Sequence, residues 1–252
     1  MSSFYTDVSR QGNTIMWRGY ENGRKFSKKV QFEPTLYVQA KEETGYTSLI
    51  GGIPLQPKRF PSMRDAKEFL ERYSDVTGFN ICGNSNYIAQ FIQQQYPNKI
   101  EFEINQINIC MFDIEVDISD GYADTELADK RINSIAAKSS KSDTYWLFGL
   151  ENYDKYLTET GIDPEQIMFV RCDDGEELLM RFIRWWEDNM PDVVTGWNVE
   201  YFDIQYLVTR IIRLFGEETA KRLSPWASIR KTSREFYGKV QSTWLLSGIA
   251  II

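Results

Sequence analysis

Histidine is absent from this sequence of 252 residues. Its absence excludes serine–histidine and cysteine–histidine nucleophile pairs, zinc held by imidazole, and imidazole general bases. The three cysteines, Cys82, Cys110 and Cys172, are far apart, which excludes a C-x-x-C zinc site and argues against a disulfide framework. We expect them to be small buried side chains. Any chemistry must therefore depend on carboxylates, tyrosine, lysine or a bound metal ion.

Long apolar runs are also missing, and the N-terminus lacks the apolar segment of a secretory signal. The composition, with 42% apolar and 14% aromatic residues, is that of a folded chain with one large or two modest domains. We therefore expect a soluble, cytosolic protein with no membrane partner.

The net charge of −7 is unevenly distributed. Residues 1–100 carry 13 basic and 9 acidic side chains, residues 101–203 carry 8 and 24, and residues 204–252 carry 8 and 3. An acidic segment between two basic ones is unusual for a uniform domain. It indicates either an acidic metal-binding cleft flanked by basic surface or an acidic face in contact with water.

The first hundred residues predict an α+β unit. Antiparallel strands are expected within residues 3–50, and Pro54, Pro57 and Pro61 indicate a connector. Helices are expected next at residues 62–74, with Ser62 and Asp65 as a capping box, and at residues 86–96.

From residue 100 the pattern changes to strands that alternate with helices, which predicts a mixed sheet covered by helices. Strands are expected at 106–117, 131–137, 144–150, 166–172 and 192–197, with helices after the acids at 173–177 and from Asp203 to Phe215, ending at Gly216. The last stretch, 244–252, is typical of a buried strand and then stops. A natural terminus is usually polar, so either the chain was cut here or another chain supplies the next segment of the fold.

The stretch 106–117 is apolar enough for a strand with both faces covered, yet it contains Asp113 and Glu115. Side chains alternate along a strand, so both acids point to the same face. Burying unpaired carboxylates costs several kcal/mol each, roughly. We therefore expect a cation between them, either an Arg or Lys or a divalent metal.

A second polar element, G-W-N-V-E-Y-F-D at residues 196–203, comprises a strand end, a loop and a helix start. Ligands bind at the carboxyl ends of strands in such sheets. Asp203 is either a plain helix N-cap or a third carboxylate directed at the cleft of Asp113 and Glu115. Three oxygen donors without histidine favour Mg²⁺ or Mn²⁺ over zinc.

These two elements, D-I-E at 113–115 and N-x-x-x-F-D at 198–203, resemble the first two exonuclease motifs of family B DNA polymerases. Three further stretches resemble the replicative polymerases of T-even-like bacteriophages: D-G-Y at 120–122, T-G-W-N-V-E at 195–200 and F-G-E-E-T-A-K-R-L-S-P at 215–225. The resemblance covers essentially the whole chain. It implies an α/β fold: an α+β N-terminal domain at 1–105, then an RNase H-like mixed-sheet 3′–5′ exonuclease domain at 106–252.

The resemblance also implies site residues. In that family four carboxylates act with two metal ions, and Asp113, Glu115 and Asp203 fall at three of these positions, as catalytic metal ligands for Mg²⁺ or Mn²⁺. The resemblance also implies contacts to DNA. Tyr122 would be an aromatic residue against the single-stranded 3′ end, and Asn198 and Phe202 fall at motif positions that hold the strand. Tyr237 would lie at the tip of a β-hairpin that helps move the primer.

Two parts of the family pattern are missing. The third exonuclease motif, a Tyr and an Asp four residues apart, is absent because the sequence ends first, and so are the polymerase palm, fingers and thumb. We therefore expect the N-terminal part of a replicative DNA polymerase, with an incomplete proofreading exonuclease and little or no activity alone.

The implied partners are single-stranded and primer–template DNA and the remainder of the polymerase, covalently linked or as a separate chain, in the cytoplasm of an infected bacterial host; RNA binding is left open. Two alternatives also stay open. The chain is either a nucleic-acid-binding module without catalysis, or a structural half that associates with a separately encoded polymerase half.

Overall fold

The computed structural model describes residues 3–154, 156, 159, 161–236 and 238–252. The chain folds as two compact units, Met1–Phe102 and Glu103–Ile252. The division lies three residues before the boundary at 105/106 expected from the sequence.

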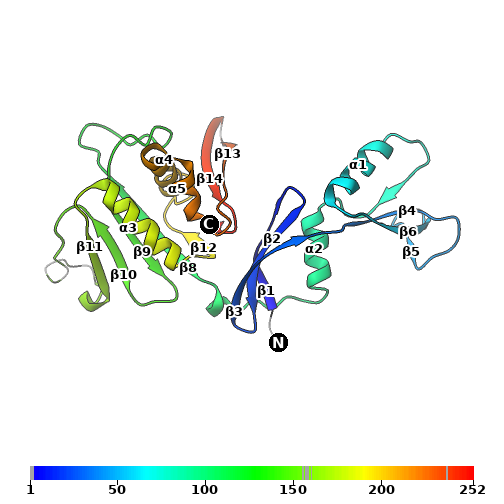
Figure 1. Cartoon of the computed structure of the whole chain (residues 1–252), viewed down its shortest axis with the longest axis horizontal. Helices are drawn as coiled ribbons and strands as arrows, with labels where there is room; N and C mark the ends of the chain where they lie inside the picture. The colour runs from blue at the N-terminus through cyan, green and yellow to red at the C-terminus, as the bar shows by residue number, and fades with distance from the viewer. Residues whose placement is uncertain (1–2, 155, 157–158, 160, 237) are drawn as a thin grey trace. The chain divides into compact units, whose positions relative to one another are not determined.

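The first unit contains two antiparallel sheets and two helices (Figure 1). One sheet has the order β1-β2-β3, from Ser3–Gln11, Thr14–Glu21 and Arg24–Gln31. The other has the order β5-β6-β4-β7, from Tyr46–Thr47, Pro54–Arg59, Thr35–Gln39 and Ile81–Cys82. Helices α1 (Met63–Tyr73) and α2 (Tyr87–Gln95) begin after the N-caps Ser62 and Asn86. The α+β prediction for this unit is confirmed.

The connector expected around Pro54 and Pro57 is wrong, because both prolines belong to strand β6. Proline lacks the amide proton with which a residue of a central strand bonds to a neighbouring strand. Here β5 pairs only with Pro54 and Leu55, so the outer edge of β6 has no described strand partner at Pro57. The sheet therefore accommodates Pro57.

The second unit has a six-stranded mixed sheet of order β11-β10-β9-β8-β12-β15. Its strands are β8 (Ile109–Val116), β9 (Ile132–Ser139), β10 (Tyr145–Gly149), β11 (Ile167–Arg171), β12 (Val193–Thr195) and β15 (Ala250–Ile251). Only β9 runs antiparallel to β8; β10, β11, β12 and β15 all run parallel to β8. The predicted mixed sheet is confirmed and is consistent with an RNase H-like domain.

Helices α3 (Gly175–Asp188) and α4 (Asp203–Phe215) supply the apolar core of this unit, followed by the short α5 (Glu217–Ala220). The ring of Phe112 on β8 stacks on Phe182 of α3 at 5.5 Å between centroids and contacts Trp186. Helix α4 packs against β8 and against β14. Gly216 ends α4 with φ +84°, as the sequence predicted.

Residues 244–252 were predicted to form one buried strand, and the structure divides them between two strands. Strands β13 (Ile229–Phe236) and β14 (Lys239–Leu246) form an antiparallel hairpin, and a turn at Ser247 and Gly248 leads to β15 at the sheet edge. A side chain at Gly248, which has φ +88°, would lie 2.7 Å from Trp226 and Pro225. Glycine therefore breaks the apolar run into two elements.

Strand β8 has one buried and one exposed face, so the expectation of two covered faces is wrong. Cys110, Phe112 and Ile114 are 2–4% exposed, whereas Met111, Asp113 and Glu115 are exposed. The apolar core with α3 and α4 lies on the first face only.

Candidate active site

Strands β8 and β12 lie side by side and parallel, so their carboxyl ends meet at one edge of the sheet (Figure 1). Thr195 ends β12 opposite Met111, and the next residue, Gly196, lies close to the backbone of β8. A Cβ at Gly196 would lie 2.5 Å from the carbonyl oxygen of Phe112. Only glycine fits this close approach, which brings the following loop next to the acids of β8.

The loop from residue 198 to 202 is a tight turn that leads into α4. Asn198 has a positive φ of 54°, and its carbonyl oxygen accepts hydrogen bonds from the amides of Tyr201 (3.2 Å) and Phe202 (3.0 Å). The side chain of Asn198 is exposed, whereas Phe202 is partly buried and stacks on Tyr206 at 6.0 Å between ring centroids. In this structure both residues shape the entry to the helix.

Asp203 is the first residue of α4 and is only 2% exposed. Its Oδ1 accepts a hydrogen bond of 3.0 Å from the amide of Ile114, the residue between Asp113 and Glu115. Burial raises the pKa of Asp203 to about 6; the charges of Asp113 and Glu115 add to the rise, and the hydrogen bond from Ile114 opposes it. The structure therefore places the Asp203 carboxylate against the backbone between Asp113 and Glu115, across 89 residues of sequence from Ile114.

Asp113 and Glu115 are exposed, which corrects the expectation that they are buried together. Among the described residues, neither they nor Asp203 form an ion pair with a lysine or arginine. Of the two expected alternatives, an Arg or Lys is thus not found among these residues, and a divalent metal stays a prediction. The cost of burial falls on Asp203 instead, since the other two carboxylates remain hydrated.

The donor set suits a hard divalent ion, because all three groups are carboxylates. Within the described ranges, however, no three acidic or cysteine side chains lie close enough together to hold a metal ion. The chemistry of the donors fits such an ion, while their side-chain positions would have to change to bind it.

Of the other two residues expected to contact nucleic acid, the structure describes Tyr122 but not Tyr237. Tyr122 is 95% exposed, in the connection 117–131 between β8 and β9. Tyr237, which follows β13 in the sequence, lies outside the described residues. The role of each remains a prediction.

Sequence reasoning missed an apolar hollow of about 320 Å³ on the exposed face of the sheet, beside Asp113. Met111, Ala136, Tyr145 and Trp197 contribute to its lining. Trp197 is 91% exposed, directly after Gly196. The signal for it was a large aromatic residue within the polar strand-to-helix loop.

A mixed sheet with two acids near the carboxyl end of its central strand β8, and a buried aspartate at the start of the helix that follows the parallel strand β12, defines a class of nuclease-like folds. Residues 73–243 match the profile of the DNA polymerase family B exonuclease domain. The chain belongs to this family, whose exonuclease domains use divalent metal ions.

The chain is similar to two phage DNA-directed DNA polymerases. It is 32% identical to that of Escherichia phage RB69 and 29% identical to that of Enterobacteria phage T4, in each case over all of this chain and 30% of the relative. The chain thus spans about a third of the length of these relatives, and it is homologous to their exonuclease region. No described helix combines the length and apolarity needed to cross a bilayer.

Proposed function

We propose that Asp113, Glu115 and Asp203 bind Mg²⁺ or Mn²⁺ and serve the 3′–5′ proofreading hydrolysis of DNA by a viral replicative polymerase. The observation that carries the proposal is the hydrogen bond from the amide of Ile114 to Asp203. It joins the helix start to the strand between two exposed acids that have no ion pair within the described part of the chain.

The three acids have different tasks in this proposal. Asp203 is fixed by its backbone hydrogen bond and by burial, so it provides a rigid ligand. Asp113 and Glu115 are exposed, so their side chains can rotate toward an ion without disturbing the core. A divalent ion held there would stabilise the negative charge that develops on the phosphate oxygens during hydrolysis.

The substrate in this proposal is the single-stranded 3′ end of primer–template DNA. Tyr122 supports it, because its exposed ring can stack on a terminal base. Asn198 is exposed in the loop that leads into α4, and Phe202 holds this loop to the helix through its ring contact with Tyr206. We assign Tyr237 to the same DNA path by the family resemblance alone.

The remaining parts of the proposal concern the whole protein. We propose that the unit 106–252 acts as the exonuclease domain, the unit 1–105 as the N-terminal domain, and the rest of the polymerase as a covalent or separate partner, in the infected bacterial host. The chain alone should hydrolyse DNA slowly, since the family uses four carboxylates and this chain supplies three.

The proposal is tested first by metal binding. Mn²⁺ should raise the Tm of the chain by a few degrees, because an ion that binds only the folded state contributes roughly 1–3 kcal/mol at tens to hundreds of Kd. The double variant Asp113→Asn, Glu115→Gln should lose most of this shift. Lys138→Gln and Asp143→Asn, on the neighbouring strand and turn, serve as charge-change controls and should retain it. An equal shift in the double variant would refute the assignment.

Activity gives the second test. A longer chain that adds the polymerase's third exonuclease motif should remove mismatched 3′ ends much faster than the present chain, and Asp113→Ala with Glu115→Ala should abolish that excision. Equal rates for both lengths, or excision that survives the double substitution, would contradict the proposal.

One observation favours the alternative of binding without catalysis. Strand β3 is a sheet edge with four exposed cations, Arg24, Lys25, Lys28 and Lys29. Such an edge can contact phosphates irrespective of the acids. If DNA affinity depends on these cations while no metal response is found, binding without hydrolysis is the better account; RNA in place of DNA tests the open question of RNA binding.

A further inference from the structure

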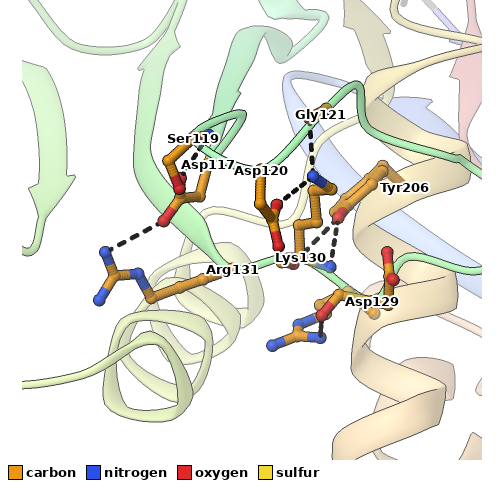
Figure 2. Close-up of polar contacts among 9 residues, drawn as sticks. Asp117, Ser119, Asp120, Gly121, Asp129, Lys130, Arg131 and Tyr206 are labelled. Carbon is orange, nitrogen blue, oxygen red and sulfur yellow. Dashed lines mark hydrogen bonds and ion pairs between the residues drawn. The ribbon is translucent and has the colours of Figure 1, made fainter.

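The connection 117–131, which carries Tyr122, is held by the side chain of Lys130 (Figure 2). The Nζ atom of Lys130 donates to the carboxylate of Asp120 and to the carbonyl oxygen of Gly121, the latter at 2.7 Å. The Lys130 side chain is 14% exposed, whereas Asp120 is 85% exposed. Lys130 thus reaches from an interior position to the two residues that precede Tyr122.

Lys130 is itself held by helix α4. The amide of Lys130 donates to the hydroxyl of Tyr206 at 3.0 Å, and that hydroxyl donates to the carbonyl oxygen of Lys130 at 2.9 Å (Figure 2). One turn further along α4, Arg210 donates to the carbonyl oxygens of Ala128 and Asp129 at 3.1 and 2.8 Å. Side chains of α4 therefore bind the main chain of the connection at residues 128–130.

These contacts form a continuous path from Asp203, at the start of α4, through Tyr206 and Lys130 to Tyr122. We infer that Lys130 is a positioning residue for the DNA 3′ end: it fixes the segment of Tyr122 relative to the acidic site, with Tyr206 as its anchor. The inference rests on the proposed function, because Tyr122 must contact DNA for its position to matter. Lys130 itself contacts no reacting group.

The connection has other ties to the domain, but they lie after Tyr122: Gln205 and Arg213 of α4 donate to the carbonyl oxygens of Thr125 and Leu127, at 3.4 and 3.2 Å, and Lys231 pairs with Glu126. The contacts before Tyr122 are mostly local. Ser119 donates to Asp117 at 3.0 Å and Gly121 donates to Ile118 at 3.2 Å, both bonds within the segment. These bonds lie within the turn and do not tie it to the rest of the domain, so they depend on Lys130 to stay closed. Arg131 pairs with Asp117 at 3.5 Å, a contact at the strand end, with the Arg131 side chain 52% exposed.

A positioned aromatic ring binds a DNA end better than a mobile one, because binding then has less conformational freedom to remove. Removing the Lys130 ammonium should therefore weaken binding of a 3′ end while leaving general attraction to DNA largely intact. The same loss of charge at Arg131 should not have this selective effect.

The first experiment measures the positioning itself, without DNA. Amide hydrogen exchange of Ser119 and Gly121 in the full chain should rise about tenfold in Lys130→Met, because the segment would open without its tie to the domain. Tyr206→Phe should raise the exchange of the Lys130 amide, and Arg131→Met should change neither. Unchanged exchange in Lys130→Met would overturn the inference.

The second experiment measures binding of two DNA probes by fluorescence anisotropy in EDTA: a linear single strand with a 3′-hydroxyl end and a circular single strand of equal length. Lys130→Met should weaken binding of the linear strand by about fivefold and leave the circular strand within twofold. Equal losses for both probes would show that Lys130 is only a phosphate contact, and would overturn the inference.

Lys130→Arg provides the rescue, because it retains a cation that can reach Asp120; it should restore both the exchange and the preference for the linear strand. If Lys130→Met does not fold, the comparison is made with Tyr206→Phe, and normal exchange and binding in that variant would overturn the inference. An unmodified chain that shows no preference for a 3′ end contradicts the proposed function, while the exchange result still decides whether Lys130 ties the segment to α4.

Discussion

The two faces of strand β8 carry opposite kinds of side chain, although they belong to the same eight residues. On one face Cys110, Phe112 and Ile114 are 2–4% exposed and contact the core shared with α3 and α4. On the other, Met111 is 58% exposed and the two acids are in contact with water. The first face accounts for stability, and the second carries two acids of the proposed site.

This difference resolves the problem that the sequence posed. Two acids in an apolar run need compensation only if they are buried, and in this fold they are not. The buried acid is Asp203, which comes from a different element and receives a backbone hydrogen bond. Charge is thus concentrated at an edge where water remains available to two of the three groups.

The strongest test of the comparison removes one large side chain from each face. Phe112→Ala should lower the free energy of unfolding by about 3–5 kcal/mol, because it leaves a cavity against Phe182 and Trp186. Met111→Ala should lower it by less than about 1 kcal/mol, since the side chain is mostly exposed. Urea denaturation of both variants measures the difference. Similar losses would mean that the open face is also packed.

The second test concerns the buried acid. Because the pKa of Asp203 is raised from 3.8 to about 6, the folded state holds its proton more tightly than the unfolded state does. The stabilisation by this proton is present below pH 4 and is lost as the pH rises through 6. By 1.36 kcal/mol per pKa unit the loss is about 2–3 kcal/mol.

Asp203→Asn should therefore stabilise the metal-free chain at pH 8 by about 2–3 kcal/mol and have little effect at pH 4. Asp113→Asn is the matched control: it is exposed, so a change within about 0.5 kcal/mol is expected at either pH. Thermal denaturation in EDTA at the two pH values measures both. A destabilised Asp203→Asn at pH 8 would indicate that the carboxylate is compensated by a cation.

The smallest of the three effects concerns the close approach of Gly196 to the backbone of β8. A methyl group at Gly196 would overlap the carbonyl oxygen of Phe112, so Gly196→Ala should cost roughly 1–3 kcal/mol by forcing the two strands apart. Gly45→Ala is the control, because no atom lies within 4 Å of its added Cβ; it should change stability by less than about 0.5 kcal/mol. Equal stabilities would show that the loop can move away from β8.

The sequence predicted the elements of the site better than their surroundings. The helix from Asp203 to Phe215 and the strand that carries Asp113 and Glu115 were both predicted, because capping, periodicity and alternation are local properties. Which face of that strand is covered depends on the positions of α3 and α4, and a single strand cannot reveal this. The contacts of Lys130 with Tyr206 and Asp120 join residues up to 76 positions apart, beyond the reach of any local pattern.

The pairing of β8 also has a consequence for the order of folding. Strands β8 and β9 are joined by a connection of moderate length, whereas β12 must return over about 80 residues to pair with β8. Closing a long loop costs entropy before any contact compensates for it, so pairings between distant residues form slowly. The hydrogen bond between Ile114 and Asp203 spans 89 residues and can form only after β12 has docked. During refolding we therefore expect the β8–β9 hairpin to gain protection first and the acidic site to assemble last.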